Sequence, residues 1–560
     1  MIVGGNNVGK STICEALDLV LGPDRLNRFP AVEEFDFYNA MYIDKDKASI
    51  PIVIQVVLTE LSPEVTSRCG NHIEFWHRTE RRAIGHGELD KVDEHCESCL
   101  RLTMIANYDQ KEDEFEANTY FTHSPDAEEG QLTKVSKTIK RIFGFLYLRA
   151  LRTGTRALSL ERGSLLDVIL RMKEARSGLW EETLQRLRSM EPPIEQKAGE
   201  LISILRDIEK RLGEYVAIDG RERPTRLYVS KLTREHLRKT LSFFLSVSAD
   251  QVPIPFQQVG TGTLNTLVLA LLSFIAETKK ENVIFAMEEP EIALPPHTQR
   301  RIANYLLTKT TQCFVTTHSP YIIERFDPQQ IIVLKRSHKG ELTGTEINLS
   351  SALKAKTYLK HVRKGLAEGM LSNGVIVSEG ITETAVLQAA AQIMESSDRS
   401  LNPLDLAGVT FISADGDGNL SEFGQFFKSL DIPVFAFYDK KKRSADENRK
   451  IKEAFDYANE TEYLGMEALL TSEVPTDHQW VLLCQYRKCD IECKLGIPSQ
   501  RPTDNILKEH TIKVLKGGKG EGRGAELIGI CALDELPISV RSFLDHIYTL
   551  YSKEEPQEDD

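Results

Sequence analysis

One short apolar run stands out because it ends in an acid. Residues 375–378 are apolar or small and lead directly into Glu379-Gly380, and an Ala- and Leu-rich helical pattern follows at once. This order predicts a buried strand with Glu379 at its carboxyl end, which is where α/β folds carry their chemistry. The glycine after the acid lets a metal or a phosphate approach the backbone closely. Taken alone, Glu379 also fits a surface acid at a strand end, which is the commoner case.

The alternation of strand and helix continues beyond this run. Apolar strand-like runs occur at 408–413 and 433–438, and the second of them ends in Asp439. A helical pattern lies between them around 423–430, and Glu467 lies in a region further along. Because alternating strands and helices favour a parallel sheet, the predicted fold class is α/β.

The first half of the chain changes its hydrophobic period. From about residue 49 to 122 the sequence alternates in short β-type runs separated by polar turns, which predicts strands. Residues 161–215 switch to helical spacing, with an apolar seam at Ala198, Leu201, Leu205, Ile208 and Leu212. Such a seam fits a helix packed on its own domain and, equally, a paired helical arm between subunits.

Residues 4–12 match the phosphate-loop pattern G-x-x-x-x-G-K-[ST]. An apolar helical pattern follows directly, as expected if the N–H groups of a helix N-terminus face the phosphates. In this pattern Lys10 supplies positive charge and the Ser11 hydroxyl reaches Mg²⁺. The predicted nucleotide-binding residues are Gly4, Asn7, Gly9, Lys10, Ser11 and Thr12. Only three residues precede Gly4, which is too few for a full strand.

Three further segments combine an apolar run with glycine, acid or histidine. A turn containing Gly260 and Gly262 opens a long apolar helix and offers a second anion site at its N-terminus. A hydrophobic strand-like run ends in Glu288 and Glu289, and another ends in His318. The histidine alone fits a structural imidazole, but the order of the phosphate loop and these three segments favours a functional role.

In this order the four segments resemble the ATP-binding-cassette type of ATPase in its SMC and RecF-like branch. The resemblance implies that ATP lies between the phosphate loop of one subunit and the signature helix of another. It also implies that Glu288 helps to hold Mg²⁺, Glu289 polarises the attacking water and His318 senses the γ-phosphate. Gly260 and Gly262 would then close the partner's nucleotide, so at least a homodimer is expected.

The later acids resemble the metal site of the Toprim fold of topoisomerases, primases and certain nucleases. A cassette ATPase followed by a Toprim unit is the arrangement of the overcoming-lysogenization-defect (OLD) family of nucleases. Further stretches that look like this family are 148–152, 162–164, 379–383 and 516–519. The chain is identified as a member of that family: an ABC-type P-loop ATPase with a helical dimerisation insertion, followed by a Toprim parallel-sheet domain.

The resemblance implies a set of catalytic residues in the Toprim unit. These are Glu379, Glu383, Asp439, Glu467, Lys516 and Lys519. The first two acids would serve one metal ion, the other two a second, and a lysine would neutralise the scissile phosphate. Carboxylates suit Mg²⁺ or Mn²⁺, and two such ions can clamp the attacking and leaving oxygens.

One position departs from the family pattern. Where an Asp-x-Asp pair is expected, the chain reads Asp439-Lys440-Lys441. A cation there either replaces part of a second metal's charge, giving a one-metal mechanism, or leaves a site that binds DNA and cleaves weakly. Asp415 and Asp417 are substitute ligands or, with their flanking glycines, part of a turn near DNA.

The composition indicates which kinds of protein are expected, and it agrees with the resemblance described above. A chain of 560 residues exceeds one core, and its net charge of −13 argues against coating nucleic acid with the whole surface. Local basic stretches at 440–443 and 513–523 fit a DNA channel or solvated loops. No apolar run can cross a bilayer and the N-terminus does not resemble a signal peptide, so we expect a cytoplasmic protein with reduced thiols.

Two pairs have ligand-like spacing for a tetrahedral Zn²⁺, namely Cys69-x-x-His72 and Cys96-x-x-Cys99. Ordinary buried or hairpin cysteines are the alternative.

These observations predict a domain order and a function. The predicted boundaries are 1–160 and 236–345 for the ATPase, 161–235 for a helical arm, 346–372 for a linker, 373–548 for the Toprim unit and 549–560 for an acidic tail. The predicted function is an ATP-regulated, metal-dependent DNA endonuclease or nickase. By resemblance it acts in defence against phage, often beside a helicase or another sensor. The alternatives are an ATP-gated DNA-binding or assembly component and a RecF-like repair ATPase, which explains the first half alone.

Overall fold

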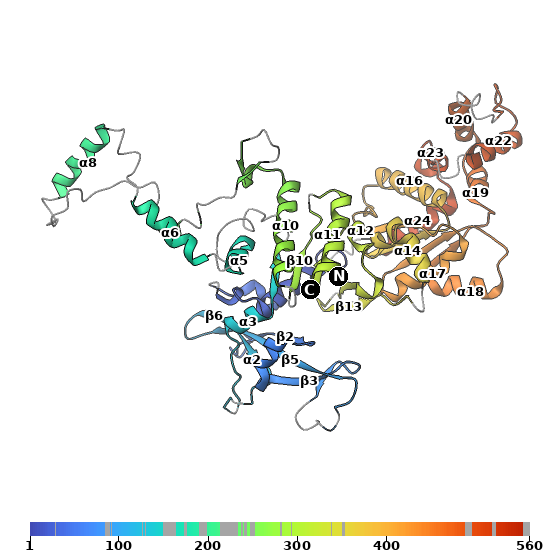
Figure 1. Ribbon diagram of the computed structural model, residues 1–560. Coiled ribbons are helices and arrows are strands. Elements are labelled where there is room, and N and C mark those ends of the chain that lie inside the picture. The colour runs from blue at the N-terminus through green and yellow to red at the C-terminus, as the bar shows by residue number, and fades with distance from the viewer. Residues whose placement is uncertain are drawn as a thin grey trace. The chain divides into compact units, whose positions relative to one another are not determined.

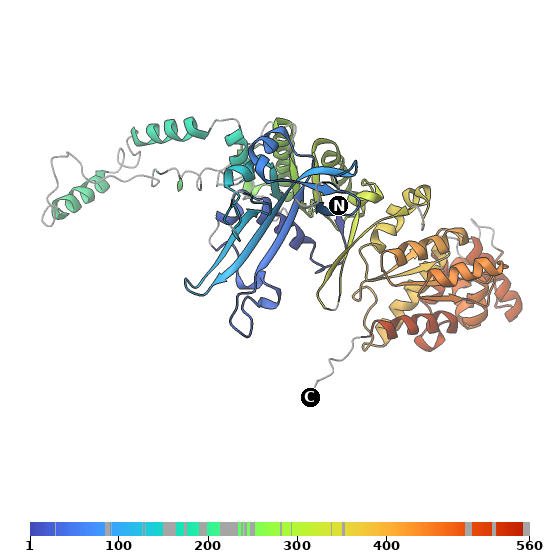
Figure 2. The same ribbon diagram turned by 90° about the horizontal axis from the view of Figure 1, so that it is seen from below.

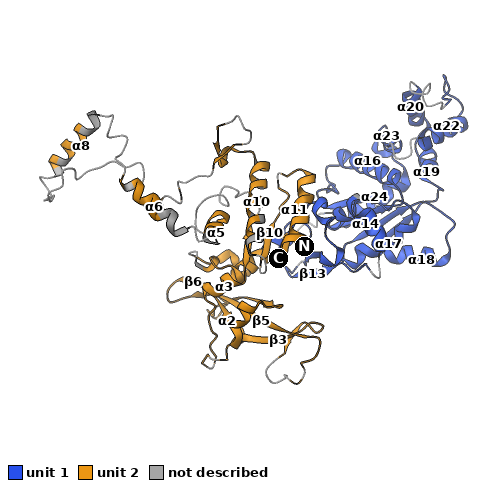
Figure 3. Cartoon of the chain, viewed as in Figure 1, with its two compact units in different colours: residues 1–12, 316–560 blue, residues 13–315 orange. Residues whose placement is uncertain are grey.

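The computed structural model forms two compact units, unit 1 with residues 1–12 and 316–560 and unit 2 with residues 13–315 (Figure 3). No helix in the described part of the chain is long and apolar enough to cross a membrane. The structure describes all residues except 28–29, 85–89, 91, 126, 129, 149–163, 173–175, 190–198, 213–232, 234, 237–238, 240–243, 247–251, 280–282, 293, 338, 350–352, 488–495, 518–521 and 553–560.

A four-stranded parallel sheet forms the centre of the C-terminal half of unit 1. Its order is β15-β14-β16-β17, and all three pairings are parallel. The strands are β14 (Gly374–Ser378), β15 (Val409–Ser413), β16 (Val434–Tyr438) and β17 (Tyr457–Glu460). Every residue of β14 and β16 is buried, as expected for central strands covered on both faces. The predicted α/β fold with a parallel sheet is therefore confirmed.

Helices cover both faces of this sheet (Figure 1 and Figure 2). On one face, Ile376 and Phe437 share a buried cluster with Leu387 of α16 (Ile381–Ser397) and Phe543 of α24 (Ile538–Leu550). On the other face, α17 packs against β14 and β16 and buries Phe423 completely. The remaining helices are α17 (Asp417–Ser429), α18 (Ala445–Ala454), α19 (Met466–Glu473), α20 (Thr476–Tyr486), α22 (Asp504–Gly517) and α23 (Arg523–Ile528).

The rest of unit 1 holds the phosphate-loop pattern and the segment that leads into the parallel sheet. Strand β1 (Ile2–Val3) pairs in parallel with β12 (Ile332–Arg336), which forms an antiparallel hairpin with β13 (Leu342–Glu346). The two-residue strand β1 thus supports the loop that follows it. The connecting helices are α12 (Pro320–Ile323), α14 (Ala355–His361) and α15 (Leu366–Gly369).

Unit 2 contains a five-stranded antiparallel sheet built around its longest strand, β5. Leu100, Leu102, Met104 and Ala106 alternate along β5 and are completely buried, which explains the β-type period of the sequence. The strands are β2 (Ile52–Leu58), β3 (Ile73–His77), β4 (Arg82–Ile84), β5 (Cys96–Asp109) and β6 (Glu114–Phe121).

The structure contradicts the four-ligand zinc hypothesis. Cys96 and Cys99 lie three positions apart on β5, so their side chains point to opposite faces of the sheet. His72 instead stacks on Phe121. Among the described residues, Cys96 instead lies close enough to His77 and Asp93 for these three side chains to hold a metal ion. The cysteine spacing would suit a loop, but on a strand it separates the two thiols.

The other elements of unit 2 include helices and the three short strands β7, β10 and β11, of which β7 and β10 pair in parallel. The predicted helical region contains α5 (Leu165–Met172), α6 (Arg176–Ser189) and α8 (Gly199–Leu212). On α8, Ile204 and Ile208 are about half exposed, while Ala198 lies outside the described residues. A paired arm therefore stays a prediction. The other elements are α2 (Pro63–Cys69), α3 (Lys137–Ile142), β7 (Phe145–Leu148), α10 (Thr261–Lys279), β10 (Ile284–Glu288), α11 (Pro296–Lys309) and β11 (Gln312–Thr316).

Candidate functional site

Acidic side chains meet at the carboxyl edge of the parallel sheet in unit 1. Glu379 directly follows β14, and Asp439 directly follows β16. Because Ser378 pairs with Phe437 in a parallel register, the two strand ends lie side by side. Glu383 lies in the first turn of α16 and, like Asp439, is buried. The structure therefore brings together the acids that the sequence places far apart.

Glu467 joins this group through a tight backbone turn. It lies in the first turn of α19, two residues after Gly465, whose φ of 155° disfavours other residues. A Cβ at Gly465 would lie 3.1 Å from a Glu467 carboxylate oxygen and 3.9 Å from one of Asp439. A Cβ at Gly380 would similarly lie 2.7 Å from a Glu383 oxygen. Glycine at these two positions leaves the carboxylates room to converge.

The carboxylates have the properties of a cation site. Burial, then the negative charges of Glu383 and Glu379, raises the pKa of Asp439 to about 7. The Oδ1 of Asp439 and the Oε2 of Glu379 are buried and have no hydrogen-bond partner. Carboxylate oxygens left in this way are costly, and a divalent cation such as Mg²⁺ or Mn²⁺ would satisfy them. The residues therefore fit a divalent ion.

The acids are nevertheless not preassembled as a tight three-ligand cage. In a compact three-ligand site the ligand atoms lie within 4.8 Å of one another, and no three of these carboxylates do so. Among the described residues, His77, Asp93 and Cys96 meet this condition. A cation from the protein already lies in the group, because the Lys441 ammonium forms an ion pair with Glu379. The carboxylates would therefore have to move closer together to bind one ion.

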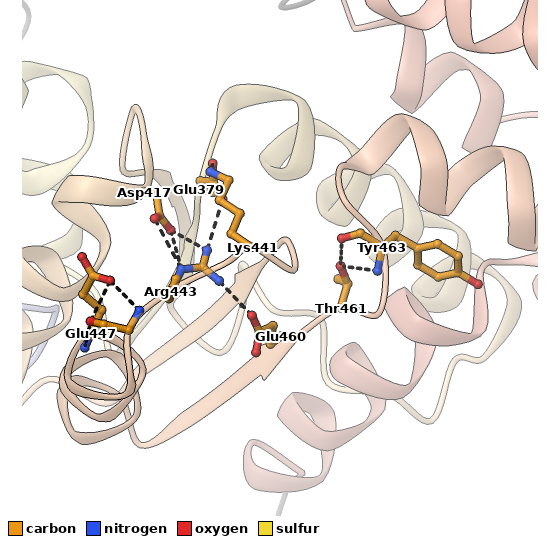
Figure 4. Close-up of polar contacts among 9 residues, drawn as sticks. Glu379, Asp417, Lys441, Arg443, Glu447, Glu460, Thr461 and Tyr463 are labelled. Atoms are coloured by element: carbon orange, nitrogen blue, oxygen red, sulfur yellow. Dashed lines mark hydrogen bonds and ion pairs between the residues drawn. The ribbon is translucent and has the colours of Figure 1, made fainter.

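Arg443 also faces these acids, although the sequence did not single it out. Its Nη2 lies 2.5 Å from Asp417 Oδ1, and its Nη1 lies 2.8 Å from Glu460 Oε1 (Figure 4). The same Nη2 lies 3.8 Å from Glu379 Oε2. Only 3% of the Arg443 side chain is exposed, so this residue of the basic stretch 440–443 is not part of a solvated loop.

Two local motifs fix the loop that carries Arg443. Ser444 caps α18 and forms a capping box with Glu447, which sets where the helix begins. At the other end of the loop, the Lys440 N–H donates to the carbonyl of Tyr463. The capping box, Ser-x-x-Glu, is readable in the sequence and could have indicated that Arg443 lies directly before a helix at the sheet edge.

Both acids of the Gly-rich turn are paired with cations. Asp415 lies 3.0 Å from Lys360 Nζ of α14, and Asp417 is held by Arg443. Their use as substitute metal ligands is therefore not supported by this geometry.

The two predicted lysines are placed unequally. Lys516 is exposed in the last turn of α22, which packs against α19, the helix that carries Glu467. Lys519 lies outside the described residues.

The phosphate-loop pattern forms a loop that ends at a helix N-terminus, as predicted. Helix α1 (Lys10–Leu21) begins at the lysine of the pattern. Lys10 is buried and its Nζ donates to the carbonyls of Gly4 (3.0 Å) and Gly5 (2.7 Å). Gly4, Asn7 and Gly9 all have positive φ, and turns with positive φ are found where backbone N–H groups bind anions. Ser11 and Thr12 are exposed beside them.

The other predicted nucleotide residues also lie at the ends of their predicted elements. Glu288 is buried at the end of β10 and accepts a hydrogen bond from the Tyr147 hydroxyl of β7 at 2.7 Å. Glu289 follows with a φ of 42°. His318 follows β11, and Gly260 immediately precedes α10, whose first turn contains Gly262. Tyr147 is a contact of Glu288 that sequence reasoning missed.

Comparison with protein families gives two matches. Residues 1–323 match the family described as "AAA ATPase domain". Residues 370–440 match the family described as "Overcoming lysogenization defect protein-like, TOPRIM domain". The second match begins just before β14 and includes Glu379, Glu383 and Asp439.

Individual proteins match the chain at low sequence identity. The "Old nuclease" of Escherichia phage P2 is 25% identical over an alignment of 208 residues, and the match covers 34% of this chain and 35% of the phage protein. The chain therefore matches about a third of that relative's length. The C-terminal region of the Xanthomonas campestris pv. campestris OLD protein is 23% identical, covers 32% of this chain and 96% of that one, and superposes with a TM-score of 0.22. A Pyrococcus furiosus Smc head domain is 13% identical, and the match covers 65% of this chain and 92% of the Smc chain with a TM-score of 0.31. TM-scores this low do not establish a shared fold.

Proposed function

Because the chain belongs to the AAA ATPase domain family over residues 1–323 and to the OLD-like TOPRIM domain family over residues 370–440, we propose that it is an ATP-regulated, metal-dependent DNA endonuclease or nickase. The observation that supports this most is the convergence of Glu379, Glu383, Asp439 and Glu467 on one sheet edge, where buried oxygens of Glu379 and Asp439 have no hydrogen-bond partner. We also propose the domain boundaries predicted from the sequence, a cytoplasmic location and a role in defence against phage.

The four acids would hold Mg²⁺ or Mn²⁺, and such an ion would stabilise the charge that develops during phosphodiester cleavage. The protein's own groups orient the acids and neutralise charge. Exposed Lys516, on a helix packed against that of Glu467, is a candidate to contact the DNA phosphate. In the ATPase part, Lys10, Ser11 and Glu288 would bind ATP and its Mg²⁺, with Glu289 and His318 at the γ-phosphate, and a homodimer would bring in Gly260 and Gly262.

A plasmid assay tests the proposal. Supercoiled plasmid is incubated with the full chain and Mg²⁺ or Mn²⁺, with and without ATP, and nicked and linear forms are separated on a gel. The expected result is nicking that requires the divalent ion and changes with ATP. Cleavage that persists in excess EDTA would contradict the metal-dependent assignment.

The ion pair between Lys441 and Glu379 favours a second candidate function. If the lysine stays on the acid, the Toprim unit binds DNA or a partner without cleaving it, and ATP gates that binding. The same assay separates the two, because this candidate gives an ATP-dependent shift of the plasmid in a native gel and no nicked product.

Tyr147→Phe is expected to slow ATP hydrolysis about tenfold, because the substitution removes the hydroxyl that orients Glu288. The measurement is steady-state phosphate release, with ATP affinity determined in parallel and expected to be unchanged. Tyr108→Phe is the matched control, since Tyr108 makes a comparable bond to Asp113 on an exposed hairpin of the same unit. Equal rates for both variants would contradict a positioning role for Tyr147.

Metal binding at the acids is expected to weaken as the pH falls below about 7. Because the pKa of Asp439 is raised to about 7, this carboxyl is protonated below that pH and must release its proton to bind a metal. The Mn²⁺ affinity should therefore fall by roughly tenfold per pH unit below pH 7 and level off above it. Isothermal titration of nucleotide-free protein across this range measures the effect, and an affinity that does not change with pH would contradict it.

A further inference from the structure

Two cations reach the metal edge of the Toprim unit, and they differ in how firmly they are held. Arg443 binds Asp417 and Glu460 and approaches Glu379, with 3% of its side chain exposed. Lys441 pairs with Glu379 alone and leaves 41% of its side chain exposed. The arginine is thus built into the edge, whereas the lysine can leave it.

The contacts of Arg443 need the shape of a guanidinium group. Nε and Nη2 donate to Asp417 at 3.1 and 2.5 Å, while Nη1 donates to Glu460 at 2.8 Å in another direction. The group also lies 4.9 Å from the centroid of the Tyr438 ring, which attracts a cation. A lysine ammonium has no planar fork and could not make these bonds together.

The acids of the edge therefore divide into two sets. Asp417 and Glu460 are neutralised by Arg443. Asp439 and Glu467 instead crowd the space beside Gly465, and the Oδ1 of Asp439 has no hydrogen-bond partner. The first set already contains a fixed positive charge, and a divalent ion placed there would be repelled by it.

We propose that Arg443 is a positioning residue that takes the place of a second metal ion, so that the Toprim unit binds one divalent ion per chain, through Glu379, Glu383, Asp439 and Glu467. The inference rests on the metal-dependent function proposed above, and it names Arg443, not Lys441, as the residue that sets the number of ions.

Counting bound Mn²⁺ tests this directly. The full chain is titrated without nucleotide by isothermal calorimetry, in a Ser11→Ala background that removes the metal-binding hydroxyl of the phosphate loop. Sites that disappear on further substitution of Asp439→Ala belong to the Toprim unit. The expected loss is one ion per chain, and a loss of two ions of similar affinity would overturn the proposal.

Substitution of each cation separates their roles. Arg443→Met should raise the count to two ions, because it frees Asp417 and Glu460, whereas Arg449→Met, on the exposed face of α18, should leave one. Lys441→Ala should also leave one ion and bind it about two- to fivefold more tightly, since an exposed ion pair competes only weakly. A folded Arg443→Met variant that still binds one ion would overturn the role of Arg443.

Circular dichroism shows whether Arg443→Met folds. If it does not fold, Arg443→Lys is the replacement variant, since it keeps a positive charge at the position and should retain one bound ion. The number of ions bound by the wild-type protein then decides the question. The titrations contain no DNA, so they are independent of cleavage. One ion without any nicking would reject the nuclease function and leave the ion count standing, whereas nicking with two ions would reject this inference alone.

Discussion

Replacing either Glu379 or Asp439 with alanine is expected to abolish plasmid nicking, with a loss of at least about a hundredfold. Both acids follow adjacent parallel strands, and each presents a buried oxygen without a hydrogen-bond partner. Removing one takes away a direct metal ligand, which is more damaging than losing a residue that only orients a ligand. The measurement is the initial rate of nicking with Mn²⁺ for each variant and the wild type.

Glu509→Ala, an exposed acid on α22, is the control for a change of charge alone and should nick at the wild-type rate. Thermal unfolding separates loss of the site from loss of the fold. Asp439→Ala is not expected to lower the stability at neutral pH, because it removes a carboxylate that burial and its acidic neighbours disfavour. Nicking that survives both alanine variants would reject the nuclease assignment.

Lys10→Ala is expected to abolish ATP binding and, with it, every effect of ATP on the protein. Lys10 is buried at the start of α1 and its ammonium bonds two carbonyls of the loop, so it both shapes the loop and supplies its charge. The measurement is binding of a fluorescent ATP analogue, with hydrolysis measured in parallel. A fall in affinity of at least about a hundredfold is expected, corresponding to about 3 kcal/mol.

The matched control is Lys428→Ala, since Lys428 is an exposed lysine of unit 1 that also bonds a backbone carbonyl. It should bind the analogue like the wild type. If Lys10→Ala binds the analogue with unchanged affinity, the loop does not hold the nucleotide and the ATPase assignment of residues 4–12 fails.

The apolar pattern was sufficient to predict the sheet that carries the site. Residues 375–378 and 433–438 are runs of apolar or small residues, and both form buried central strands, so the acids after them were predictable. The two family matches confirm the resemblance to the OLD family and the order of ATPase and Toprim domains.

The environment of Arg443 could not be predicted in the same way. Its partners Glu379, Asp417 and Glu460 follow or end three strands, and only the strand order of the folded sheet makes them neighbours. The zinc hypothesis failed for a related reason, because the cysteine spacing says nothing of whether the chain there is a loop or a strand.

The pairing of β1 with β12 also bears on how the chain folds during synthesis. Ile2 lies opposite Ile332, so the pairing that supports the phosphate loop cannot form until residue 332 has left the ribosome. Unit 2 is continuous from residue 13 to 315, whereas residues 1–12 belong to unit 1 together with the segment that follows unit 2. A nascent chain is thus kept from assembling its phosphate loop before most of the ATPase has been made.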